Sequence, residues 1–263
     1  MSARHSPGFT IIETVLFLSV TGLLILGVLI GAGASINRQR YRDAVESFKE
    51  VLQTQYADLG SLRNDRTGTW RCDTAAVATA GGAGAVARGQ SECLMVGKYV
   101  RIDKADITIY KVLAREKTSA VKGNDVTRLA SNYAYNISTD DIETRTLDWG
   151  TSIGWPMNGS GVRPSGTTLG ILMIRSPDSG SIYTFTNNAI PPKTGITQAT
   201  FTDMIVPGAV TPGQAARTVC VVSNGLVTTG DMSIHIDSFA ASASAIDTQT
   251  NEYIKSQGLV SQC

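Results

Sequence analysis

Histidine is almost absent from this chain, and its scarcity limits the enzymatic chemistry available. The 263 residues include only two histidines, His5 and His235. Too few parts are therefore present for a Ser-His-Asp arrangement beyond His235 or for a His-based metal site. His235 alternates with Ile234 and Ile236, as residues of a β-strand do, so we expect a surface or packed strand residue there. We predict no enzymatic activity, no metal site and no cofactor.

Basic and acidic residues are also nearly equal in number, so neither charge is in excess. The chain has 23 Lys and Arg against 22 Asp and Glu, for a formal net charge of +1. This balance does not imply nucleic acid, another polyanion or an acidic lipid surface as an obligatory partner. The distribution is uneven, however, because residues 14–37 carry no charge at all and the segment that follows is densely charged.

Two short motifs lack the context that ligand binding requires. The run Gly81-Gly82-Ala83-Gly84 has neither the spacing nor the strand–turn–helix setting of a dinucleotide-binding loop, so we expect a flexible loop. Asp140, Asp141 and Glu143 do not have the Asp-x-Asp spacing with a following glycine that is typical of calcium loops. We interpret these three acids as a solvated turn.

What the chain does have is one long apolar stretch near its start. From Thr14 to Ala34 it offers 21 uncharged, mostly apolar residues, and an α-helix of roughly 20 residues crosses a bilayer. A secretory signal peptide is a weaker interpretation, because the run is longer than an h-region, Glu13 lies near its start and no Ala-x-Ala site follows. An ordinary signal anchor stays possible on hydropathy alone.

The residues at the start of this stretch carry a more specific signal. They read Gly8-Phe9-Thr10-Ile11-Ile12-Glu13-Thr14 and resemble the type III signal of the type IV pilin family. The resemblance covers about residues 4–60. It implies cleavage after Gly8 by a prepilin peptidase, N-methylation of Phe9, and Glu13 as the acid five places into the mature chain. It also implies a filament built from copies of this chain or other pilins, with the help of an assembly platform in the inner membrane.

The chemistry of these residues fits that role. Glycine before the scissile bond lets the backbone approach a protease closely. A carboxylate inside an apolar helix costs about 2.5 to 3.5 kcal/mol at mid-membrane, and less toward the interface. Cleavage leaves a cationic amine on Phe9 that can pair with Glu13 of a neighbouring subunit in a low-dielectric core and set the filament register. Alternatively, Glu13 lies at the cytoplasmic interface and snorkels.

Four glycines interrupt the apolar stretch. Small residues let helices approach closely, and two of the four have G-x-x-x-G spacing. Glycine also costs about 1 kcal/mol relative to alanine inside a helix. We expect partial unwinding of this stretch in a filament, although many pilins also have a proline there and this chain does not. The four positions are Gly22, Gly27, Gly31 and Gly33.

Beyond Asn37 the pattern becomes amphipathic. Apolar residues recur at steps of three and four, which predicts one helix that continues to about Leu59 and stops at Gly60. The expected stripe is Tyr41, Val45, Phe48, Leu52 and Leu59, with Val51 and Tyr56 beside it. Three arginines at the start of this segment conflict mildly with the positive-inside tendency if the head is extracytoplasmic. They are Arg38, Arg40 and Arg42.

The remainder predicts a β-rich head, so the fold class is α+β, a long helix packed on an antiparallel sheet as in the pilin lollipop. The expected parts are a leader (1–8), a membrane or polymerisation helix (9–36), an amphipathic helix (37–60) and the head (61–263). Alternating β-branched and aromatic residues predict strands at 99–103, 107–113, 133–137, 171–175 and 182–185.

Two further elements are expected near the C-terminus. Thr218–Val222 and Leu226–Thr229 flank Asn224-Gly225, the pair favoured in a two-residue type I′ hairpin turn. Residues 239–257 show helical spacing at Ala243, Ile246, Thr250 and Tyr253, with Gly258 placed to cap a helix.

Four cysteines allow three disulfide pairings, and the sequence contains no C-x-x-C. Disulfides are favoured over metal ligation in an exported head. We expect the sequence-local pairs Cys72–Cys93 and Cys220–Cys263, the second of which would resemble the C-terminal disulfide loop of pilins.

Three functional hypotheses follow. The first is a major or minor subunit of an extracellular type IV pilus, held in the cytoplasmic membrane by one span before assembly. The second is a pseudopilin of a type II secretion machine, which shares the same N-terminal segment. The third is a surface enzyme or binding module on an ordinary signal anchor, which Glu13 beside a cleavable Gly8–Phe9 bond disfavours.

Overall fold

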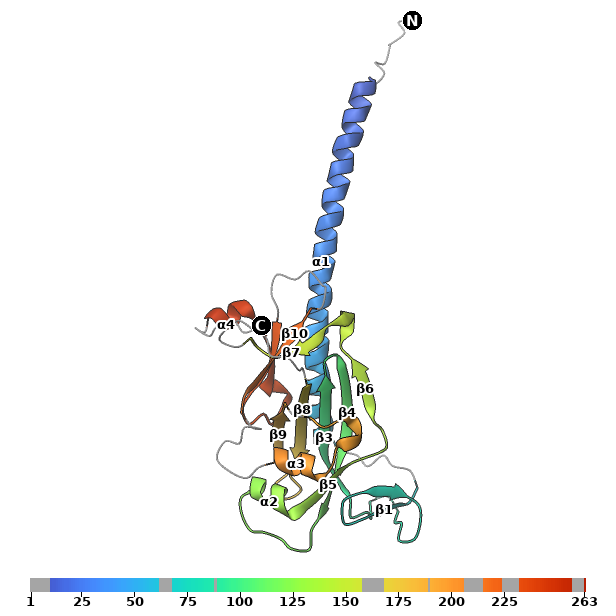
Figure 1. Cartoon of the computed structure of the whole chain (residues 1–263), viewed down its shortest axis with the longest axis vertical. Coiled ribbons are helices and arrows are strands. Elements are labelled where there is room, and N and C mark those ends of the chain that lie inside the picture. The colour runs from blue at the N-terminus through green and yellow to red at the C-terminus, as the bar shows by residue number, and fades with distance from the viewer. Residues whose placement is uncertain are drawn as a thin grey trace, which may run out of the picture.

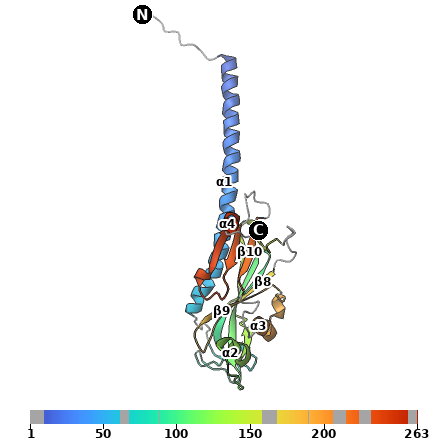
Figure 2. The ribbon, with the colours of Figure 1, turned by 90° about the vertical axis from the view of Figure 1, so that its left-hand side faces the viewer.

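The structure is a computed structural model, and it combines one very long helix with a β-rich head. It describes residues 10–61, 68–87, 89–157, 168–188, 190–205, 215–223, 232–256 and 263. The helix α1 (Ile11–Gly60) projects from one end of the head for about half of its length, as Figure 1 shows. Figure 2 shows the same arrangement from the side, with the rest of α1 lying along the head.

The boundaries of α1 follow from local chemistry. Thr10 is the N-cap, and its hydroxyl accepts a hydrogen bond from the Glu13 amide at 3.2 Å. The helix then runs for 50 residues, or about 75 Å at 1.5 Å per residue. It ends at Gly60, and the Ser61 amide donates to the Asp58 carbonyl at 3.2 Å. The prediction of one helix to the Leu59–Gly60 boundary is confirmed.

The second half of α1 is a core element of the head. Its buried residues recur at three- and four-residue steps, so one stripe faces the sheets. The predicted stripe is confirmed, with Val51 partly buried at its margin. Gln55 is also buried although it is polar. The buried set is Tyr41, Ala44, Val45, Phe48, Leu52, Gln55, Tyr56 and Leu59.

The larger sheet is antiparallel at every pairing described and contains all five strands expected in this part of the chain. Its order is β5-β4-β3-β8-β9, with β6 paired to the other end of β4. The bounds are β3 (Leu94–Asp103), β4 (Asp106–Glu116), β5 (Tyr133–Ile137), β6 (Glu143–Thr146), β8 (Thr168–Arg175) and β9 (Ile182–Asn187).

Both faces of this sheet are covered. On β3, Val100 and Ile102 pack in the cluster that contains α1, whereas Tyr99 packs with Leu129 and Phe201 on the opposite face. That opposite face is covered by α2 (Asp125–Asn132) and α3 (Gln198–Met204), which Figure 1 places at the end of the head away from the projecting helix. Coverage on both faces explains why β3 is buried almost continuously from Val96 to Ile102.

A second antiparallel sheet, not anticipated as a separate unit, also packs on α1. Its order is β12-β11-β10-β7, and its residues Val219, Val221, Ile234 and Ile246 share a core with α1. A small hairpin joins β1 to β2. The remaining elements are β1 (Trp70–Cys72), β2 (Ala78–Ala80), η1 (Asp148–Gly150), β7 (Ser152–Gly154), η2 (Lys193–Gly195), β10 (Arg217–Val222), β11 (Met232–Ile236), η3 (Ala243–Ala245), β12 (Ile246–Thr250) and α4 (Asn251–Ser256).

The prediction of a helix over residues 239–257 is wrong. Residues 246–250 form β12, and a helix follows only from Asn251 to Ser256. β12 pairs with the edge of β11, with Ile246 opposite Ile236 and Thr248 opposite Ile234. Pairing with the free edge of β11 gives the backbone of residues 246–250 hydrogen-bond partners and buries Ile246. The stability gained from these contacts outweighs the helical spacing of the sequence. Gly258 lies outside the described residues.

The prediction of a two-residue turn after β10 is also wrong, because the observed pairing of β10 with its partner strand has a different register from the one that such a turn requires. A turn at Asn224-Gly225, which lies outside the described residues, would place Val221 opposite Thr228. Instead Val221 pairs with Met232. The strand expected at 218–222 is confirmed as β10 and is antiparallel to β11, but the connection between them is longer than predicted.

Candidate functional site

The projecting half of α1 is the largest unpartnered apolar surface in the described structure. No residue of α1 before Tyr41 is buried, and the large apolar side chains between Ile11 and Ile36 are each 47 to 82% exposed. Their run is long and apolar enough to cross a membrane. A helix that is apolar all round is stable only when lipid or other helices surround it. This half of α1 is the candidate site, named below the projecting segment.

Glu13 is the one acidic residue of the projecting segment, and the structure gives it a local role that the sequence reasoning missed. The Thr10 amide donates to Glu13 Oε2 at 3.5 Å, while the Glu13 amide donates to Thr10 Oγ1 at 3.2 Å. These reciprocal bonds form a capping box. The signal was present in the sequence as Thr-x-x-Glu ahead of an apolar run.

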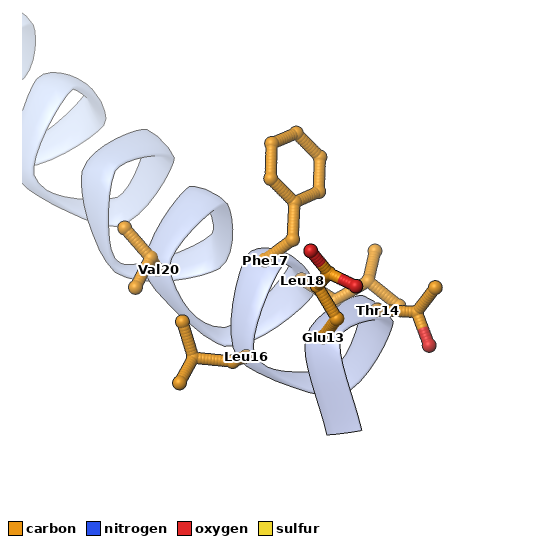
Figure 3. Close-up of a pocket in the computed structure, with 6 residues that line it drawn as sticks. All are labelled: Glu13, Thr14, Leu16, Phe17, Leu18 and Val20. Atoms are coloured by element: carbon orange, nitrogen blue, oxygen red, sulfur yellow. The ribbon is translucent and has the colours of Figure 1, made fainter. Parts of the chain in front are cut away.

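Glu13 also borders an apolar hollow on the helix surface. The hollow is lined by residues of the first three turns, and Figure 3 shows the carboxylate on the same side of the helix as the Phe17 ring, one turn further on. The capping box engages Oε2, and Oε1 has no hydrogen-bond partner within the described chain. A cation that approaches this side can therefore meet a carboxylate oxygen next to an apolar wall. The lining residues are Glu13, Thr14, Leu16, Phe17, Leu18 and Val20.

The predicted cleavage residues Gly8 and Phe9 lie outside the described residues, which begin at Thr10. Cleavage at the Gly8–Phe9 bond would create a new amine one residue before the N-cap. That amine would be four positions from Glu13, or about one helical turn. Glu13 can thus face either its own chain terminus or the terminus of a neighbouring copy.

The glycines of the projecting segment do not interrupt α1 in this isolated chain. Helix α1 is continuous through Gly22, Gly27, Gly31 and Gly33. A Cβ added at any of the four would meet nothing within 4 Å, so each lies on open helix surface. Unwinding of this stretch was expected in a filament, and it stays a prediction.

Buried polar contacts fasten the second half of α1 to the head. At one end the Tyr41 hydroxyl donates to the Val221 carbonyl at 2.6 Å and accepts from the Met232 amide at 2.6 Å. At the other end Lys98 of β3, 7% exposed, donates to Gln55 Oε1 at 2.9 Å and pairs with Asp58. Sequence reasoning anticipated neither contact, because each joins residues that lie far apart in the chain.

The two disulfides have the expected pairing. Cys72 is joined to Cys93 and Cys220 to Cys263, each with a Cα–Cα distance of 5.5 Å. The first disulfide links the β1–β2 hairpin to the start of β3. The second ties the last residue of the chain to β10, the strand that also receives the Tyr41 hydrogen bond.

The other residues weighed from the sequence are separated from the projecting segment. His235 lies in β11, where its Nδ1 is 3.0 Å from Thr218 Oγ1 and its Nε2 is 3.4 Å from Asp237 Oδ1. Asp141 accepts from Lys111 at 2.8 Å, and Glu143 accepts from Arg145 at 2.5 Å. Within the part of the chain that the structure describes, no group of three or more His, Cys, Asp or Glu is placed to hold a metal ion.

Comparison with known proteins returns no relative: no family model, no curated protein and no solved structure matches this chain. The resemblance to pilins therefore depends on residues 8–14 and on the helix that follows them. The function must be argued from the geometry of the projecting segment.

Proposed function

We propose that this chain is a structural subunit of an extracellular filament of the type IV pilus kind. The observation that carries the proposal is the projecting segment itself, a helical extension of the head whose apolar side chains are exposed on all sides. A protein with this surface needs a bilayer or a bundle of like helices around it. A filament subunit is surrounded by the bilayer before assembly and by the bundle of helices afterwards.

The energetics favour an exchange between these two environments. Burial of one large apolar side chain contributes about 1.5 to 3 kcal/mol, so the projecting segment is held strongly in any apolar surrounding. Lipid tails and neighbouring helices are equally apolar, and transfer from one to the other costs little. The subunit can therefore wait in the membrane as a single-pass protein and then join a growing helical core.

Glu13 supplies the specificity that apolar contact lacks. Apolar helices slide past one another at low cost, whereas a charge pair in a low-dielectric core has one favoured position. In the proposed assembly, the Phe9 amine of an incoming subunit pairs with Glu13 of a subunit already in place. The open Oε1 beside the hollow in Figure 3 supports this role, and capping through Oε2 holds the carboxylate at the start of the helix.

The leader and the head fit a defined order of events. The prepilin peptidase removes residues 1–8, which frees the Phe9 amine, and an assembly platform in the inner membrane then extracts the subunit. The head lies outside the cytoplasm, where disulfides such as Cys72–Cys93 and Cys220–Cys263 persist. Copies of this chain, or other pilins, are the filament partners.

The test is to purify surface filaments from the host and identify their bulk component and its N-terminus. We expect this chain to be present and to begin at Phe9. A processed chain that is essential for protein export and absent from long filaments would assign it to a type II secretion pseudopilus. An unprocessed chain that begins at Met1 would overturn the proposal and leave a membrane-anchored surface module.

A further inference from the structure

Three arginines lie on two sides of α1 where it leaves the projecting segment and meets the head. Arg38, Arg40 and Arg42, named here the basic collar, are all exposed. None of them takes part in an ion pair with any residue that the structure describes. By contrast Lys49, two turns further along α1, lies 3.5 Å from Asp247 and 3.8 Å from Glu46. The overall charge balance of the chain conceals this local positive charge.

A strained and exposed tryptophan lies beside the basic collar. Trp149 in η1 is 53% exposed and has a left-handed backbone with φ of 57°. For a bulky residue this conformation is a genuine outlier, and such outliers are concentrated at functional sites. The Arg40 guanidinium stacks over the ring at 4.8 Å from its centroid. The ring is therefore held at the end of the head nearest the projecting segment.

The depth of these groups relative to a bilayer follows from helix geometry. If Ala34 marks the end of the hydrocarbon, Arg38 lies about 6 Å and Arg42 about 12 Å beyond it. The headgroup layer is roughly 5 to 8 Å thick on each side of the hydrocarbon. Arg38 then lies within the headgroup layer, and Arg40 and Arg42 lie beyond its outer edge, from where long side chains that lean toward the helix N-terminus can reach back to the phosphates. The next acidic residue after Glu13 is Asp43, so all the charged residues of α1 between Glu13 and Asp43 are basic.

We propose that the basic collar and Trp149 form a membrane-resting surface that binds anionic phospholipid headgroups. Guanidinium groups bind phosphate oxygens in a bidentate manner, and tryptophan is favoured at the membrane–water interface. Helix α4, with its half-exposed Tyr253, lies at the same end of the head in both views, which widens this surface (Figures 1 and 2). The inference rests on the membrane-inserted state of the proposed function.

This contact accounts for the conflict between the basic collar and the positive-inside tendency. Phosphate is present on both surfaces of a bilayer, so the collar has a partner whichever side the head occupies. Before assembly the contact sets the height and tilt of the head above the membrane. Extraction of the subunit into a filament must break it, and lipid composition then influences how readily subunits leave the membrane.

The experiment measures which lipids surround Trp149. The full-length chain is reconstituted into phosphatidylcholine vesicles that contain an equal minor fraction of either brominated phosphatidylglycerol or brominated phosphatidylcholine. The difference in quenching between the chain and its Trp149→Phe variant isolates Trp149 from the other two tryptophans. We expect brominated phosphatidylglycerol to be about fivefold enriched around Trp149 relative to brominated phosphatidylcholine. This factor corresponds to about 1 kcal/mol, the attraction of one arginine to an anionic membrane surface.

Two charge-matched variants complete the test. In Arg38→Gln/Arg40→Gln/Arg42→Gln the enrichment should disappear, and in Arg71→Gln/Lys122→Gln/Lys193→Gln, which neutralises three exposed residues elsewhere on the head, it should persist. Equal quenching by both lipids in the unchanged chain, or the same loss in both variants, would overturn the proposal. Sedimentation with vesicles after an alkaline wash reports the span separately. Failure of that step would overturn the membrane-inserted state as well.

Discussion

The hydroxyl of Tyr41 lies between two strands and joins them to α1. It donates to the Val221 carbonyl at 2.6 Å and accepts from the Met232 amide at 2.6 Å, at the point where β10 and β11 part. Val221 is fully buried, and Cys220 beside it carries the disulfide to Cys263. The start of the amphipathic half of α1 and the C-terminus of the chain are thus fastened at one place.

The first prediction compares two tyrosine-to-phenylalanine substitutions. Tyr41→Phe leaves the Val221 carbonyl and the Met232 amide without their shared partner, so the free energy of unfolding of the head should fall by about 1 to 3 kcal/mol. Tyr99→Phe removes a buried hydroxyl that has no hydrogen-bond partner among the described residues, and stability should be unchanged or higher. Denaturant titration followed by near-UV circular dichroism measures both. Equal losses in the two variants would refute the bridging role of Tyr41.

The second prediction concerns alkaline pH. Burial raises the pKa of Tyr56 and of Tyr99 to about 12, from the ordinary value of 10.0. Between about pH 10 and 12 the unfolded chain loses these protons while the folded chain keeps them. Stability present in full below pH 10 should therefore decline by about 1.4 kcal/mol per pH unit per tyrosine as pH rises toward 12.

The control for this pH dependence is Tyr99→Phe, which removes one of the buried tyrosines whose pKa is raised. Unfolding of the variant should show a shallower decline over the same pH range. A slope identical to that of the unchanged chain would mean that Tyr99 does not titrate as its burial indicates.

The third prediction concerns processing. Mass spectrometry of the mature protein should find Phe9 at the N-terminus, with one added methyl group. Gly8→Val should block cleavage, because a branched side chain hinders the close backbone approach that glycine allows. A mature chain cut after Ala34 instead would identify the apolar stretch as a signal peptide.

The fourth prediction separates the charge of Glu13 from its capping role. Gln at this position preserves a capping box, so Glu13→Gln should keep the helix start and remove only the charge. We expect processed protein at normal membrane levels and few or no filaments. Glu13→Val should behave similarly, and Glu13→Lys should be worse, because a like charge would meet the Phe9 amine in a low-dielectric core.

Thr10→Ala is the matched control for Glu13. It removes the hydroxyl that accepts from the Glu13 amide and should cost about 1 kcal/mol of helix stability, with the charge retained. Because it keeps the charge, Thr10→Ala should still form filaments, whereas Glu13→Gln should not. Filament counts by electron microscopy, with an immunoblot of processed protein, measure this difference. If Glu13→Gln as the sole subunit forms filaments as well as the unchanged chain does, Glu13 has no role in assembly.

The fifth prediction compares the two disulfides. Each closes a loop worth about 3 to 4 kcal/mol in the chain-entropy model, so Cys72→Ala/Cys93→Ala and Cys220→Ala/Cys263→Ala should lose similar stability. Only the second pair lies beside the Tyr41 contact, and Cys263→Ser or the double variant should therefore impair assembly. Non-reducing peptide mapping checks the pairing. If filaments form normally without the Cys220–Cys263 bond, this disulfide has no role in assembly.

The long helix α1 was predictable in detail because its signals are local. Thr10 and Glu13, the uncharged run to Ala34 and the stripe that begins at Tyr41 depend on helix periodicity and on contacts within a few residues. The strands at 99–103 and 133–137 were recognised for a similar reason, since alternation and turn residues are visible within each segment. The expected cysteine pairs were the sequence-local choice among three possible pairings, and the structure has them.

The sequence by itself therefore determined the long helix, its apolar and amphipathic halves, the strand-rich head and the candidate residues Gly8, Phe9 and Glu13. Only the tertiary structure decided that residues 246–250 pair with β11 instead of coiling, that Val221 faces Met232, and that Tyr41, Lys98 and Trp149 meet partners far away in the chain. These outcomes depend on which strand edges and buried polar groups still lack hydrogen-bond partners once the helix and sheets have packed. No periodicity within a short segment contains that information.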